Sequence, residues 1–177
     1  VDGVYSILQA FKNYKVEGNK RPIFFHFSTD EVYGDINDGS FKETDILKPS
    51  NPYSATKAAG DMLIKAWHRT YNIDYILLRP SNNYGIGQYI EKLIPKSVKY
   101  LNLGRKIPIH NNGSPVRGWL HAADTASAVI HLIEKNIKNE IYNISGNYYD
   151  TNLNVSKKII KNFNGDDEYK KYLDFSY

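Results

Sequence analysis

The chain has 177 residues, of which 41% are hydrophobic and 24% are charged, a composition typical of soluble globular proteins. It contains no cysteine, which excludes a disulfide framework and thiol chemistry and makes the cytoplasm the default location. No apolar run approaches the roughly 20 residues of a membrane span, and the net charge of +4 is mild and spread out, so neither a membrane nor a nucleic acid is predicted as a partner.

The first half of the chain predicts an alternation of helices and strands. Apolar residues at helical spacing predict a helix over 4–15, and the continuous apolar run at 22–27 predicts a strand buried on both faces of a parallel sheet. A loop rich in glycine and aspartate follows at 34–50, then a helix over 53–71 and a strand over 75–78. Strand, helix and strand in this order predict a right-handed parallel crossover.

Beyond Gly85 the elements become shorter and more varied. We expect a helix over 90–103 interrupted near Pro95, strands at 107–110 and 116–120, a helix over 121–135, a strand over 140–145 and a helix over 155–163. The pattern predicts an α/β protein with two domains, at 1–85 and 86–177. The helix at 121–135 is expected to pack back on the first domain.

Two groups of polar residues in the first half point to an enzyme. Tyr53 and Lys57 lie four residues apart on the predicted helix, so both side chains can act on one ligand. A nearby ammonium lowers the pKa of a tyrosine and makes it a usable general base. With 15 tyrosines in the chain, such a pair also arises by chance on a solvated helix face. Thr29, Asp30 and Glu31 add a hydroxyl and two carboxylates at a strand end, where open α/β sheets bind ligands.

Three segments carry a resemblance to a known family. They have the sequences STDEVYG at 28–34, NPYSATK at 51–57 and RPSNNYG at 79–85. Together they resemble the extended short-chain dehydrogenase/reductase superfamily and, within it, the dTDP-glucose 4,6-dehydratases. The likeness runs from about Ile23 to Gly146. The tripeptide at 29–31 separates these dehydratases from related 4-epimerases, which usually carry Ser-Ala-Thr there, and from decarboxylases and GDP-mannose dehydratases, which carry Thr/Ser-Ser-Glu.

The resemblance implies a Rossmann-like, doubly wound parallel sheet, NAD as cofactor and loss of water from a dTDP-hexose. Tyr53 would take the proton of the sugar C4 hydroxyl as C4 is oxidised, and Lys57 would contact the nicotinamide ribose. Glu31 would then take the C5 hydrogen, while a protonated Asp30 assists departure of the C6 hydroxyl. Thr29 would hydrogen-bond the C4 oxygen. Two carboxyls in opposite protonation states require environments that push their pKa values apart.

The resemblance also implies further binding residues. Ser28 and Asn82 are expected beside the cofactor, together with Tyr53 and Lys57. Contacts to the sugar nucleotide are expected from eight residues: Asn83, Glu91, Lys92, Leu93, Pro108, His110, Arg117 and Asn143.

Several of these binding residues have a plainer interpretation. The paired asparagines after the second strand also fit a simple turn, Glu91 and Lys92 fit a solvated helix face, and Arg117 fits a surface arginine. His110 stands where the dehydratases usually have a tyrosine that stacks on thymine, so it offers a smaller stacking area. Gly118 replaces the aspartate that usually follows the phosphate-binding arginine. The nucleotide preference therefore stays open at this stage.

A dinucleotide-binding domain opens with a strand, a glycine-rich turn and, about 20 residues later, an acidic residue, and these 177 residues contain no such sequence. The chain therefore resembles the central portion of a dehydratase, with a partial second domain, and we expect it to retain NAD weakly by itself. A 4-epimerase, a decarboxylase and a non-catalytic binding module on the same fold remain alternatives. The five histidines lack the spacing of a shared metal site, so no metal is predicted. The resemblance implies a homodimer formed by the helices near Val4 and Tyr53.

Overall fold

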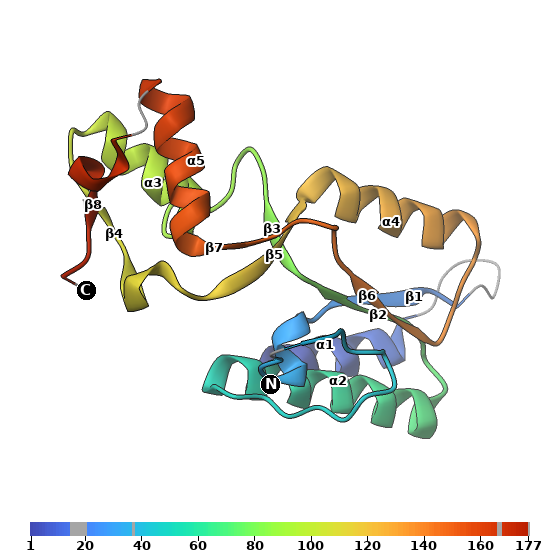
Figure 1. Ribbon diagram of the computed structural model, residues 1–177. Helices are drawn as coiled ribbons and strands as arrows, with labels where there is room; N and C mark the ends of the chain where they lie inside the picture. Colours follow the sequence, from blue (N-terminus) through green and yellow to red (C-terminus); the bar gives the residue numbers. More distant parts are fainter. Residues whose placement is uncertain (15–20, 37, 166–167, 177) are drawn as a thin grey trace. The chain divides into compact units, whose positions relative to one another are not determined.

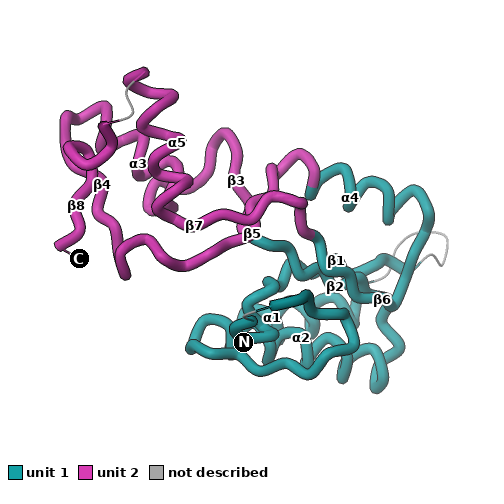
Figure 2. Tube along the Cα trace, viewed as in Figure 1, with its two compact units in different colours: residues 1–81, 125–144 teal, residues 82–124, 145–177 magenta. Residues whose placement is uncertain are grey.

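The computed structural model describes residues 1–14, 21–36, 38–165 and 168–176. The chain forms two compact units (Figure 2). Residues 1–81 and 125–144 make the first unit, and residues 82–124 and 145–177 make the second. Residues 125–144 thus belong to the first unit, although they follow residues of the second in the chain. They include most of the helix predicted at 121–135 and extend nine residues past its end.

The first unit is built on a parallel sheet of three strands in the order β1-β2-β6 (Figure 1). Its elements are α1 (Asp2–Asn13), β1 (Ile23–Phe27), the 3-10 helix η2 (Asp30–Tyr33), α2 (Pro52–Tyr71), β2 (Asp74–Pro80), the greater part of α4 (Ala122–Glu134) and β6 (Glu140–Ile144). The predicted crossover is present, because β1 and β2 pair in parallel with α2 between them in the chain. The predicted strand at 140–145 pairs with β2 as the third strand.

Helices cover both faces of this sheet, which explains the apolar character of β2. Leu77 packs with Leu8 of α1 and Ile64 of α2, whereas the next residue, Leu78, packs with Leu132 of α4 on the other face. Successive side chains of a strand point to opposite faces, so a strand covered on both sides is apolar throughout. Burial of each of these leucines contributes roughly 1.5–3 kcal/mol.

Local signals in the sequence fix both ends of α2. The Asn51 side chain accepts a hydrogen bond from the Ser54 backbone N–H at 2.9 Å, and the Ser54 hydroxyl oxygen accepts one from the Asn51 N–H at 3.3 Å. This reciprocal pair satisfies two donors at the helix start, and Pro52 occupies a first-turn position where its missing N–H costs nothing. The helix ends at Asn72, whose φ of 55° is left-handed.

The second unit combines short strands with two packed helices. Its elements are β3 (Asn82–Tyr84), α3 (Leu93–Asn102), β4 (Ile107–Pro108), η3 (His110–Gly113), β5 (Val116–His121), β7 (Tyr149–Thr151), α5 (Asn152–Asn164), η4 (Tyr169–Tyr172) and β8 (Leu173–Asp174). Strand β5 pairs in parallel with β3 and antiparallel with β7, and β4 pairs in parallel with β8. Ile107, Ile109 and Leu173 form its core with Leu101 of α3 and Ile160 of α5.

Two expectations about this region were wrong in detail. The predicted helix over 90–103 begins at Leu93 and is not interrupted at Pro95, because the proline lies in the first turn, where backbone N–H groups have no helical acceptor. The predicted strand at 107–110 ends at Pro108, and His110 begins a 3-10 helix instead.

The predicted α/β class with a Rossmann-like parallel sheet is confirmed. Within the described ranges, no helix combines the length and apolar character that a membrane crossing requires. The same residues include no group of three or more histidine, aspartate or glutamate side chains arranged to hold a metal ion.

Candidate active site

The predicted acids lie at the carboxyl end of β1. The Ser28 N–H donates to the Leu78 carbonyl at 2.7 Å, so this segment continues alongside β2 after the strand proper ends at Phe27. Thr29 then caps η2: its hydroxyl oxygen accepts from the Glu31 N–H at 3.3 Å and its O–H donates to Asp30 Oδ1 at 3.2 Å. The cap holds both carboxylates at the edge of the sheet.

The first turns of α2 bring the predicted phenol and ammonium to the same edge. Lys57 Nζ donates to the Phe27 carbonyl at 2.5 Å, at the last residue of β1. Asn51, the cap of α2, donates from Nδ2 to Glu31 Oε2 at 3.4 Å. Tyr53 is 56% exposed and therefore available to a ligand. The bonds from Lys57 to Phe27 and from Asn51 to Glu31 thus bring the start of α2, which carries the Tyr-Lys pair, to the Thr-Asp-Glu segment.

The sequence-based expectation of a lowered tyrosine pKa was wrong for the protein without ligand. Burial raises the pKa of Tyr53, and the negative charges of Glu31 and then Asp30 raise it further. The Lys57 ammonium does not offset this, since it is bound to the Phe27 carbonyl and its acidic partner is Asp61. Burial lowers the pKa of Lys57, and the charge of Asp61 acts in the opposite direction. The charges of both acids therefore act on the Tyr53 phenol.

Among the predicted cofactor contacts, Ser28 is buried at the end of β1 and Asn82 begins β3 in the second unit. The predicted sugar-nucleotide contacts fall in both units. All except Asn143 belong to the second unit: Asn83, Glu91, Lys92, Leu93, Pro108, His110 and Arg117.

The two cationic candidates of the second unit, Lys92 and Arg117, are both exposed, as is His110. Lys92 Nζ lies 3.5 Å from Glu91 Oε1, and both side chains are mostly exposed, as on a solvated surface. Arg117 lies in β5, opposite Asp150 of β7.

Asn143 has a different environment from the other predicted contacts. Its side chain accepts from the Tyr33 hydroxyl at 2.8 Å and donates to the Phe41 carbonyl at 3.0 Å, while its backbone N–H donates to Glu43 Oε1 at 2.9 Å. These bonds fasten the loop at 41–43 to the end of β6 within the first unit.

A cavity of about 600 Å³ lies against α3 and α5 in the second unit, with Tyr84, Trp119 and Phe163 among its lining residues. The predicted ligand contacts do not line it.

A family model for the NAD dependent epimerase/dehydratase family matches residues 1–145. The chain belongs to this family. Within the family it is 42% identical to a dTDP-glucose 4,6-dehydratase of Haemophilus influenzae over 163 residues, which cover 89% of the chain and 48% of that protein. It is 34% identical over 174 residues to the low-salt glycan biosynthesis protein Agl12 of Haloferax volcanii, covering 98% of the chain and 54% of that protein.

Solved structures of dTDP-glucose 4,6-dehydratases share the fold of this family member. The structure from Bacillus anthracis, in complex with NAD, matches 99% of the chain with a TM-score of 0.88 and 39% identity. The structure from Streptomyces venezuelae, with NAD and TYD bound, matches 94% of the chain with a TM-score of 0.86 and 36% identity. The predicted resemblance to dTDP-glucose 4,6-dehydratases is confirmed. The chain spans about half the length of the relatives it matches.

Sequence reasoning missed several residues that support the site in this epimerase/dehydratase domain. Asn51 donates a hydrogen bond to Glu31, and Asp61 lies one turn beyond Lys57 on α2. The buried Arg79 side chain donates to both Asp61 and Tyr33. Each has a signal in the sequence: Asn51 precedes a helix-starting proline, Asp61 follows Lys57 by four residues, and the other two belong to the family-like segments.

Proposed function

We propose that this chain carries the catalytic residues of an NAD-dependent nucleotide-sugar 4,6-dehydratase, a hydro-lyase. Its substrate would be a dTDP-hexose, with dTDP-glucose favoured, and its product the 4-keto-6-deoxy sugar. The carrying observation is that bonds from Lys57 to the Phe27 carbonyl and from Asn51 to Glu31 hold the start of α2, which carries Tyr53, against η2 at the carboxyl edge of a parallel sheet. The similarity to dTDP-glucose 4,6-dehydratases across about nine tenths of the chain supports the choice of substrate.

The residues at this edge fit the nicotinamide end of NAD. The ammonium of Lys57 and the phenol of Tyr53 stand where open α/β sheets bind ligands, and Ser28 lies beside them at the strand end. Lys57 would hold the ribose hydroxyls. NAD, when bound, would accept hydrogen from sugar C4 and donate it at C6. These 177 residues contain no glycine-rich turn of the dinucleotide-binding type.

Each residue of the site would have one task in the proposed reaction. Tyr53 takes the C4 hydroxyl proton, and Thr29 hydrogen-bonds the C4 oxygen. The C4 ketone acidifies the neighbouring C5 hydrogen, which the Glu31 carboxylate removes. Asp30 gives a proton to the departing C6 hydroxyl, so one water leaves and a C5–C6 double bond remains. Return of the hydride to C6 and of a proton to C5 would then give the 4-keto-6-deoxy sugar. General acid–base steps of this kind each contribute about 10²–10⁴-fold in rate.

The predicted contacts of the second unit would hold the nucleotide. Arg117 is exposed, and its planar guanidinium suits the diphosphate oxygens in pairs. His110 is also exposed and would stack on the base. The remaining contacts are Asn83, Glu91, Lys92, Leu93 and Pro108.

We also place this activity in a cytoplasmic homodimer. Helices α1 and α2 pack against each other and still leave Tyr5, Ile7 and Met62 at least 45% exposed. Large apolar side chains exposed on neighbouring helices support an interface there.

Three substitutions test the roles in the full-length protein, with any residues that flank this chain. We expect Tyr53→Phe to slow oxidation at C4, and Glu31→Gln and Asp30→Asn to block water loss, each by about 10²–10⁴-fold. Mass spectrometry of the sugar product measures the loss of one water, and release of deuterium from C5-labelled substrate measures the Glu31 step. Glu134→Gln, at the end of α4, is the matched control and should retain the wild-type rate.

The product decides between this proposal and its alternatives. A product of unchanged mass would indicate an epimerase, loss of carbon dioxide a decarboxylase, and no conversion a binding module. Formation of the 4-keto-6-deoxy sugar at the wild-type rate by Glu31→Gln would overturn the role of that residue.

A further inference from the structure

A buried ion pair lies beneath the candidate site. Arg79 Nε, at the end of β2, is 3.0 Å from Asp61 Oδ2 on α2, and the two residues are 1% and 0% exposed. Asp61 lies one helical turn beyond Lys57, and their charges interact. A buried ion pair is seldom more stabilising than well-packed apolar residues, so its value is better sought in the geometry that it specifies.

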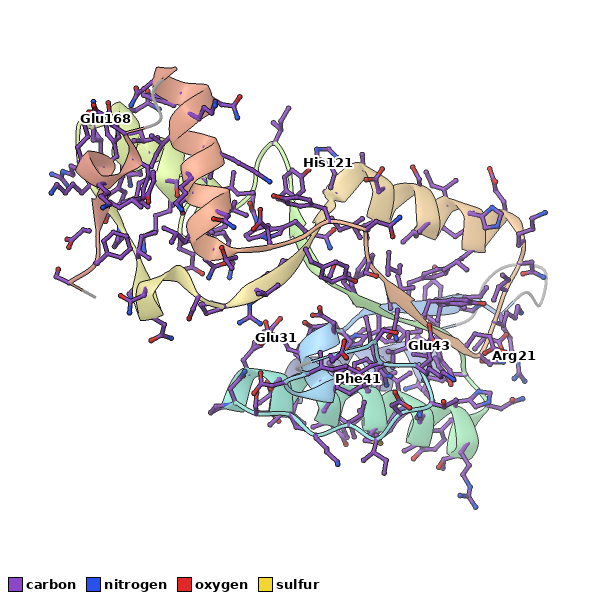
Figure 3. All side chains as sticks on the ribbon, in the orientation of Figure 1. Arg21, Glu31, Phe41, Glu43, His121 and Glu168 are labelled. Carbon is purple, nitrogen blue, oxygen red and sulfur yellow. The ribbon has the colours of Figure 1, made fainter. Side chains whose placement is uncertain are left out.

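The same guanidinium reaches the segment that carries the acids. Arg79 Nη1 donates to the Tyr33 hydroxyl at 2.5 Å and to the Glu43 carbonyl at 3.2 Å. The guanidinium carbon lies 4.8 Å from the centre of the Tyr33 ring, and the Phe41 ring stacks on that ring with 4.9 Å between the ring centres. Tyr33 donates in turn to Asn143 Oδ1. In Figure 3, Phe41 and Glu43 lie to the right of Glu31.

The Arg79 side chain connects η2, which carries the two acids, to α2, which carries Tyr53 and Lys57. Tyr33 is the last residue of η2, the short helix that begins with Asp30 and Glu31. Its hydroxyl is tied through Arg79 to Asp61 and hence to α2, the helix that presents Tyr53 and Lys57. A 3-10 helix of four residues has few hydrogen bonds of its own, so its orientation depends on such outside anchors.

We propose that Tyr33 is a positioning residue: its hydroxyl, held by Arg79 and Asn143, fixes the direction in which η2 presents Asp30 and Glu31. Tyr33 does not touch the substrate in this role. The inference rests on the proposed dehydration. It adds that loss of water depends on the buried hydrogen bond between Arg79 and the Tyr33 hydroxyl, in which neither Asp30 nor Glu31 takes part. A displacement of a catalytic group by about 1 Å can lower a rate roughly 100-fold, so loss of this anchor affects the chemistry more than substrate binding.

Tyr33→Phe removes the hydroxyl and keeps the ring between Phe41 and the guanidinium, so the core of η2 stays packed. In the full-length protein we expect release of the C5 hydrogen to slow by about 10- to 100-fold, with KM changed less than about threefold. Oxidation at C4, followed by the isotope effect of C4-deuterated substrate, should be much less affected. Tyr75→Phe is the matched control: it removes the same atom from a buried ring at the start of β2 and should leave both steps unchanged.

Hydrogen exchange at the backbone of residues 29–34 supplies a readout that needs no activity. We expect exchange there to become at least about tenfold faster in Tyr33→Phe, and to stay at the wild-type rate in Tyr75→Phe. If wild-type protein does not dehydrate the sugar, the proposed function fails while the exchange data still decide the anchoring role. If Tyr33→Phe matches Tyr75→Phe in exchange and in C5 release, the positioning role is wrong and the dehydratase function stands.

Discussion

The acidity of Tyr53 is set by two neighbouring carboxylates as well as by burial. Burial raises the pKa of Tyr53 most, and Glu31 and then Asp30 raise it further. A raised pKa favours the neutral phenol, so the proposed role of Tyr53 as a base requires cations or hydrogen-bond donors that stabilise its phenolate.

Glu31→Gln should lower the pKa of Tyr53 toward the ordinary value, because it removes the larger of the two charge effects. The glutamine carbonyl can still accept the bond from Asn51, so the local geometry should hold. Titration of the tyrosine ring carbons by NMR, with Tyr53→Phe for assignment, measures the change. Glu140→Gln is the control, since Glu140 raises the pKa of Tyr75 instead. An unchanged Tyr53 titration in Glu31→Gln would show that the acid is too distant to act on it.

The sequence predicted which polar residues gather at the site but not how their charges balance. Spacing places Tyr53 and Lys57 on one helix face, and the structure agrees. The sign of the tyrosine pKa shift depends on distances to side chains from another element and on where the ammonium is bound, which spacing does not contain. The contacts of Asn143 depend in the same way on a loop a hundred residues earlier in the chain.

At the scale of elements, the start of α2 links folding to the site. The Asn51 side-chain oxygen caps α2 by accepting from the Ser54 N–H, and its amide nitrogen donates to Glu31. One residue therefore both starts the helix and contacts a candidate catalytic acid. Proline and asparagine at 51–52 made the start of this helix predictable. The short strands β3, β7 and β8 were not predicted, because two or three residues carry too little periodicity and owe their conformation to partners far along the chain.

Asn51→Ala should destabilise the first unit by about 1 kcal/mol, because the Ser54 N–H loses its acceptor. It should also reduce the proposed dehydration beyond this loss of stability, since Glu31 loses its amide contact. Thr151→Ala removes the matching cap of α5 in the second unit, where the threonine oxygen accepts from the Asn154 N–H at 3.1 Å. Urea denaturation and the release of C5 hydrogen compare the two variants. Equal losses of activity in both would argue against a special role of the α2 cap.

At the scale of the whole molecule, the chain returns to its first sheet after building most of a second unit. Strand β6 pairs with β2 across more than sixty residues of sequence, and α4 covers the sheet face opposite α1 and α2. The apolar runs predicted a sheet buried on both faces. They did not assign β6 to it, because strand pairing over such a distance is decided by which sheet edge is open and not by local pattern.

The unfolding free energy of the protein should depend on pH through His26, which lies in β1 under α2. Burial and then the charge of Lys57 lower the pKa of His26 from 6.5 to about 4. The folded state therefore favours the neutral ring, and the unfolded chain binds a proton more readily between these values. The contribution of His26 to the unfolding free energy is fully present above pH 6.5 and decreases as the pH falls toward 4. The total decrease is on the order of 1–2 kcal/mol once solvent screening is allowed for.

Substitution of two histidines isolates this contribution from that of the carboxylates. His26→Gln cannot take up a proton, so the fall in its unfolding free energy between pH 6.5 and 4 should be smaller than that of the wild type. His131→Gln, at an exposed position late in α4, should follow the wild-type curve. Chemical denaturation at a series of pH values measures both. Parallel curves for His26→Gln and the wild type would mean that water reaches the ring and that burial under α2 does not keep it neutral.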